Sequence, residues 1–152
     1  MKIWVDADAA PNDVKSIVAK AALRLEIETA FVANQRLWTP VNNPFVEAVR
    51  VEGGPDVADD HIAEHAEAGD LAVTADIPLA ARLVEKGARV VDPRGEEYTR
   101  ENIGERLSVR DFMDSLRSTG VETGGPSARS SKDTQAFAAT FDRVLTKLVR
   151  SR

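Results

Sequence analysis

Cysteine is absent from this sequence of 152 residues. Its absence excludes disulfide bonds, thiolate zinc sites and a thiol nucleophile. The chain also lacks any apolar run near the roughly 20 residues that a membrane-spanning helix needs. An acidic residue, Asp6, interrupts the N-terminus before the apolar region of a signal peptide can form. We therefore expect a cytoplasmic protein that makes no membrane contact.

Basic residues are in short supply. The chain has 20 Lys and Arg against 25 Asp and Glu, a net charge of −5, so it does not coat nucleic acid through bulk charge. The rest of the composition is ordinary, with 43% hydrophobic and 30% charged residues, which excludes disordered and collagen-like chains. The length suits a single domain with a sizeable core.

The negative charge is concentrated in one stretch. Such a run is either a solvated surface or an acidic pocket, in which protonation or a cation relieves the repulsion between carboxylates. Where these residues lie in the fold decides between the two. Residues 51–81 carry no Lys or Arg and eight acids: Glu52, Asp56, Asp59, Asp60, Glu64, Glu67, Asp70 and Asp76.

Hydrophobic periodicity predicts strands that alternate with helices, which is typical of a parallel sheet covered on both faces. We predict an α/β fold, a three-layer sandwich around a mostly parallel five-stranded sheet, with extra C-terminal helices. Residues 1–152 are expected to form one domain, with an α/β core at 1–98 and a helical extension at 99–152. The predicted strands are 2–5, 29–33, 45–51, 71–74 and 88–91, the helices are 12–25, 57–68, 78–86, 99–107, 108–116 and 132–149, and residues 118–131 form a flexible loop.

Polar residues follow most of the predicted strands. Ligands of open parallel sheets bind beyond the carboxyl ends of the strands, so we expect these side chains to converge at one edge. Oxygen ligands without His or Cys suit Mg²⁺ or Mn²⁺, and cations held by carboxylates commonly hydrolyse phosphodiesters. The residues are Asp6, Asp8, Asn34, Asp76 and Asp92 at the strand ends, with Asp56, Asp59 and Asp60 near the start of helix 57–68.

Each of these residues also has a simpler interpretation. Asp76 precedes Ile77-Pro78 and is a natural helix N-cap. Asp8 and Asp92 suit turns, and Asp60 suits a solvated helix face. Asp6 is the hardest to dismiss, because a carboxylate at the end of a buried strand is costly unless it has a role.

One motif points to different chemistry. Residues 61–65 (HIAEH) match the H-x-x-E-H pattern of inverse zinc peptidases. The pattern is short, and the peptidases need a third ligand from a distant helix. We interpret His61 and His65 as surface residues, with opportunistic metal binding as the alternative.

Several segments together resemble the bacterial YaiI/YqxD family, which in turn resembles PIN-like nuclease domains. The resemblance implies a PIN-like fold in which Asp6 and Asp76 are core metal ligands and Asp59 or Asp60 is the acid on the intervening helix, while Asp8 and Asp56 also match family motifs. Ala10 departs from the family, which usually has Cys there. The matching segments are MKIWVDADA at 1–9, VAN at 32–34, DVAD at 56–59, GDLAVTADIPLA at 69–80, DPRGE at 92–96, RDFM at 110–113 and TGGP at 123–126.

We therefore predict an Mg²⁺- or Mn²⁺-dependent ribonuclease with Asp6, Asp8, Asp59 and Asp76 as catalytic residues. Two alternatives remain. The spacing of Asp6 and Asp8 matches the D-x-D of haloacid-dehalogenase-type phosphatases, and a PIN-like module could bind RNA without cutting it. The apolar content of the helices after residue 98 also allows a homodimer. The expected substrate contacts are Asn34, Arg94, Arg110, Gly124 and Gly125, with Trp38 and Tyr98 available to stack on a base.

Overall fold

The computed structural model describes residues 1–35, 42–54, 56–124 and 128–152. Helices and strands alternate along most of this length, as the hydrophobic pattern predicts. The strands are β1 (Ile3–Asp6), β2 (Thr29–Ala33), β3 (Val46–Arg50), β4 (Leu71–Val73), β5 (Arg89–Val91) and β6 (Glu97–Tyr98). The helices are α1 (Asn12–Leu25), α2 (Val57–His65), α3 (Ile77–Lys86), α4 (Ile103–Ser118) and α5 (Ser131–Ser151).

The strands form one sheet in the order β3-β2-β1-β4-β5-β6, and β1 to β5 are parallel. The predicted α/β class is confirmed, but the described residues form a sheet of six strands instead of five. The additional strand, β6, runs antiparallel to β5, with Tyr98 opposite Val90. A tight turn returns the chain, in which the amide of Asp92 donates to the carbonyl of Glu96 at 2.8 Å. Two residues are too few for a periodic pattern.

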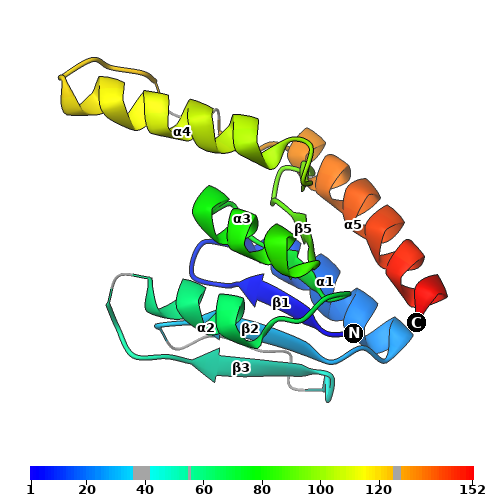
Figure 1. Ribbon diagram of the computed structural model, residues 1–152. Helices are drawn as coiled ribbons and strands as arrows, with labels where there is room; N and C mark the ends of the chain where they lie inside the picture. Colours follow the sequence, from blue (N-terminus) through cyan, green and yellow to red (C-terminus); the bar gives the residue numbers. More distant parts are fainter. Residues whose placement is uncertain (36–41, 55, 125–127) are drawn as a thin grey trace.

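Helices cover both faces of the sheet and give the predicted three layers (Figure 1). Successive side chains of a strand point to opposite faces. Ile3 and Val5 of β1 accordingly pack in the core with α1 and α5, whereas Trp4 packs in the core with α2 and α3. Asp6 follows the same alternation, so it lies on the face that α2 and α3 cover.

The C-terminal extension differs from the prediction. Residues 99–107 and 108–116 do not form two helices, because α4 is continuous from Ile103 to Ser118. The hydroxyl of Ser108 donates to the carbonyl of Gly104 at 3.1 Å, within the helix, instead of capping a new one. The helix begins late because Thr99 and Asn102 bind each other's backbone amides and form a turn.

Helix α4 projects from the body above α3 (Figure 1). None of its residues is fully buried, and Phe112 is 60% exposed. Only the two outer residues of the predicted loop at 118–131 belong to helices, because α4 ends at Ser118 and α5 begins at Ser131. Residues 125–127 of this loop lie outside the described residues. Among the described residues, no helix combines the length and the apolar character needed to cross a membrane.

Candidate metal site at the carboxyl edge of the sheet

Asp6 ends β1, in the interior of the sheet. Its side chain is buried, and Oδ2 accepts a 3.0 Å hydrogen bond from the hydroxyl of Thr74. Burial raises the pKa of Asp6, the hydrogen bond from Thr74 offsets part of that rise, and the charges of Asp76 and Asp8 add to it. The site therefore disfavours a free negative charge on Asp6 unless a proton or a cation compensates it.

Asp76 follows β4 and caps α3. Its Oδ1 accepts a 2.9 Å hydrogen bond from the amide of Leu79, as the N-cap interpretation predicts. Its own amide donates to the hydroxyl of Thr74 at 3.0 Å. Thr74 thus links Asp6 to Asp76, so the cap residue also belongs to the acidic edge.

Asp59 approaches these two residues from the first turn of α2. The negative charges of Asp76 and Asp6 act on its carboxyl group, and its pKa is raised to about 7. Burial is the largest cause, followed by the negative charges of Asp76 and Asp6. Asp59 therefore binds a proton near neutral pH, where an ordinary carboxyl group is ionised.

The structure distinguishes Asp59 from Asp60, which the sequence left open. Asp60 lies about 100° further around α2. Its Oδ1 accepts a 2.7 Å hydrogen bond from the guanidinium of Arg82, and both side chains are about half exposed. Asp59 is therefore the inward member of the two, and Asp60 forms an ion pair at the rim.

Four acids line a cleft of about 300 Å³ between the starts of α2 and α3, and the buried Asp6 lies outside its lining. Asp56 precedes α2 in the left-handed conformation, with φ of 63°, which Asp tolerates better than most residues. Arg110 reaches the same cleft from α4, where it also lies 3.4 Å from Asp114. The cleft is lined by Asp56, Asp59, Asp60, Asp76, Pro78, Leu79, Arg82 and Arg110.

Asp8 and Asn34 do not line this cleft. The Oδ2 of Asp8 accepts a 2.8 Å hydrogen bond from the amide of Asn34. The contact ties the segments that follow β1 and β2 to each other. Asp8 is exposed, and it influences the cleft through its charge, which helps to raise the pKa of Asp6.

Residues after β5 serve the turn that leads to β6. Asp92 accepts hydrogen bonds from the amides of Arg94 and Glu96 and from the hydroxyl of Tyr98, so the turn interpretation holds and Asp92 does not line the acidic cleft. Arg94 pairs with Asp133 at 3.3 Å. Tyr98 is buried, so the expectation that it stacks on a base is wrong.

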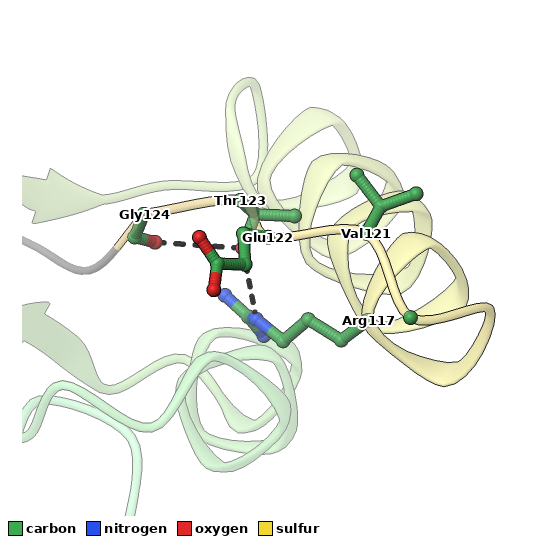
Figure 2. A pocket seen from close by; sticks show the side chains of 6 residues that line it. Arg117, Val121, Glu122, Thr123 and Gly124 are labelled. Atoms are coloured by element: carbon green, nitrogen blue, oxygen red, sulfur yellow. Dashed lines mark hydrogen bonds between the residues drawn. The ribbon is translucent and has the colours of Figure 1, made fainter.

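The glycine-containing turn after α4 lies at a separate cleft. Gly124 lines a hollow of about 420 Å³ together with Arg117, whose Nε donates to the hydroxyl of Thr123 at 3.1 Å (Figure 2). None of the acids of the edge lines this hollow, so the structure does not join Gly124 to Arg110 in one site. Gly125 and Trp38 lie outside the described residues.

Two contributors to the site were missed from the sequence. Thr74 lies in the family segment at 69–80, and its hydroxyl, two residues before the candidate ligand Asp76, is a sequence signal for a hydrogen-bonding partner. Arg82 belongs to no motif that predicts a site residue. It is four residues after Pro78, so both side chains lie on the face of α3 that lines the cleft.

The donors suit a hard divalent cation by their chemistry. All are carboxylate oxygens, and no His or Cys lines the cleft. Within the described ranges, however, no three Asp, Glu, His or Cys side chains are arranged closely enough to hold a metal ion as they stand. Binding would therefore require the carboxylates to move closer together as the ion replaces the proton on Asp59.

Comparisons with known proteins find full-length relatives. A family model described as "Uncharacterized BCR, YaiI/YqxD family" matches residues 4–147. A UPF0178 protein of Myxococcus xanthus is 56% identical over 99% of this chain and 98% of its own length. The UPF0178 protein YaiI of Escherichia coli O81 is 53% identical over 100% of this chain and 99% of its own. No solved structure gives a significant match.

Proposed function

The chain belongs to the YaiI/YqxD family, and we propose that its acidic cleft hydrolyses RNA phosphodiesters with Mg²⁺ or Mn²⁺. One observation carries the proposal. Asp59 and Asp76 line one cleft, and burial together with the charges of Asp76 and the buried Asp6 raises the pKa of Asp59 to about 7. Three carboxylates that repel one another so strongly form a site that a divalent cation relieves. The proposal rests on this chemistry, because the relatives' names state no activity.

In this proposal Asp6, Asp59 and Asp76 hold the cation. A bound Mg²⁺ or Mn²⁺ supplies a Lewis acid that activates water and neutralises charge on the leaving oxygen. Thr74 keeps Asp6 and Asp76 in position through its two hydrogen bonds. Arg110, at the rim, contacts a phosphate of the substrate and orients it over the carboxylates.

The phosphatase alternative requires Asp6 as nucleophile and Asp8 as acid and base. The contacts of both residues favour the nuclease. Asp6 is buried and accepts a hydrogen bond from Thr74, and Asp8 is engaged with the amide of Asn34. Hydrolysis of nitrophenyl phosphate, together with a trapped aspartyl-phosphate on Asp6, would favour the phosphatase alternative over the nuclease.

The experiment combines calorimetric titration of Mn²⁺ and Mg²⁺ with cleavage of labelled single-stranded and hairpin RNA and of DNA of the same sequence. Asp59→Asn and Asp6→Asn should lose metal binding and cleavage together. Asp142→Asn is the matched control. It removes an exposed carboxylate of α5 that pairs with Arg24 of α1, on the face of the sheet opposite α2 and α3. Metal-independent RNA binding without cleavage would leave the non-catalytic module, and no binding of metal or RNA would overturn the proposal.

A further inference from the structure

The two histidines of the chain form a pair on α2. His61 and His65 are one helical turn apart, so their side chains project from the same face. Their rings are stacked, with centroids 4.1 Å apart and planes inclined by 24°. Neither histidine lines the acidic cleft, although Asp59 and Asp60 of the same helix do.

A backbone contact orients one of the two rings. The Nδ1 of His65 lies 2.8 Å from the carbonyl oxygen of His61, and a ring nitrogen at that distance from a carbonyl carries the proton. The lone pair of His65 that can bind a metal is then on Nε2. Histidines that bind metals commonly donate their other ring nitrogen to a carbonyl in this way.

The pair rests on Trp4, which comes from β1. The indole lies 6.1 Å from the ring of His61 and 6.4 Å from that of His65, centroid to centroid. Its Nε1 donates to the buried Asp70 at 3.1 Å, which fixes the indole in place. The histidines therefore have a rigid apolar wall on one side, while His65 is exposed on the other.

We propose that His61 and His65 together bind a borderline divalent transition metal ion, with Zn²⁺ as the best match. Two imidazole nitrogens suit Zn²⁺, Ni²⁺ and Cu²⁺, whereas the carboxylates of the cleft suit Mg²⁺ and Mn²⁺. No third ligand side chain completes the pair among the described residues, so water fills the remaining positions. The site is thus an open two-histidine site, and it is not that of an inverse zinc peptidase.

Trp4 gives a direct readout for this site. In untagged protein carrying Trp38→Phe, Trp4 is the only tryptophan. Titration with Cu²⁺, which such nitrogen ligands bind most tightly, should quench Trp4 fluorescence in a saturable manner. His61→Gln combined with His65→Gln should weaken the apparent affinity about tenfold or more. Glu64→Gln, on the same helix between the histidines, is the matched control and should keep the affinity.

A second measurement uses Zn²⁺ itself. An ion that binds only the folded protein raises its unfolding temperature, so saturating Zn²⁺ should raise the midpoint by a few degrees in the parent protein. The double glutamine variant should lose this shift, and Mg²⁺ at the same concentration should leave Trp4 fluorescence unchanged. Equal quenching and equal shifts in the parent and the double variant would overturn the site, whatever the cleft binds.

Discussion

Thr74 and Asp6, which are 68 residues apart in sequence, are joined by a 3.0 Å hydrogen bond from the Thr74 hydroxyl to Oδ2 of Asp6. The same hydroxyl accepts a hydrogen bond from the amide of Asp76. One buried side chain thus connects the end of β1 to the turn between β4 and α3. This connection explains how two acids from distant segments come to lie at the same point of the edge.

Thr74→Val is expected to destabilise the protein by about 1–3 kcal/mol, because it leaves the buried carboxylate of Asp6 without its donor. Valine has nearly the same shape, so little of the effect comes from packing. Urea unfolding at pH 7 measures the change, and Thr74→Ser, which keeps the hydroxyl, should recover most of it. A Ser variant as unstable as the Val variant would assign the effect to the methyl group instead.

The raised pKa of Asp59 predicts a dependence of stability on pH. Because its pKa is about 7 in the folded protein and 3.8 as the ordinary value, the folded state binds the proton more tightly. The stabilisation by this proton is complete below pH 4 and is lost as the pH rises to about 7. Allowing for solvent screening of a partly exposed group, Asp59→Asn should be about 1–2 kcal/mol more stable than the parent at pH 8.

Urea unfolding of both proteins between pH 4 and pH 8 measures this difference, which should vanish towards pH 4. Asp60→Asn is the matched control, since Asp60 is paired with Arg82 at the rim. If the cleft binds Mg²⁺, adding Mg²⁺ at pH 8 should stabilise the parent and reduce the difference in unfolding free energy between the parent and Asp59→Asn. A gap of the same size at every pH would contradict the assignment of the proton to Asp59.

The fold could be predicted well wherever periodicity was strong. Helix α1 and strand β2 have the predicted bounds, because the apolar spacing is clear and Pro11 stands before the helix. The prediction failed where local chemistry replaced periodicity. Ser108 continues α4 by bonding to Gly104, and β6 exists because the turn at Asp92 returns the chain to the edge of the sheet.

The candidate site could be predicted in its residue types but not in its contacts. The rule that ligands bind beyond parallel strands brought Asp6, Asp59 and Asp76 together correctly. The choice of Asp59 over Asp60 depends on the rotation of α2 about its axis, and that rotation is set by packing of Ile62 and Ala63 against the sheet. Local sequence does not carry that information.

Asp70 belongs to the acidic run but is expected to serve stability alone. It is buried and accepts hydrogen bonds from the amides of Lys2 and Glu67 and from the indole of Trp4. Asp70→Asn replaces one of the two accepting oxygens with an NH2 group, which cannot accept a hydrogen bond from these donors. We therefore expect a loss of about 1–3 kcal/mol in unfolding free energy. Mn²⁺ affinity of the folded variant, measured by calorimetry, should not change. A large loss of affinity would extend the metal site to Asp70.

Arg110 tests whether substrate is held at the rim of the cleft. Arg110→Gln should lower kcat/KM for RNA several-fold and reduce the slope of log(kcat/KM) against log[salt] by about 0.7, the value for one phosphate contact on a single strand. Stability should change by less than about 0.5 kcal/mol, because the ion pairs of Arg110 are exposed. Arg117→Gln removes the same charge from the same helix, but Arg117 lines the other hollow, beside Thr123. If both variants lose activity equally, the charge of α4 as a whole attracts RNA, whereas a loss confined to Arg110→Gln locates the phosphate at the acidic cleft.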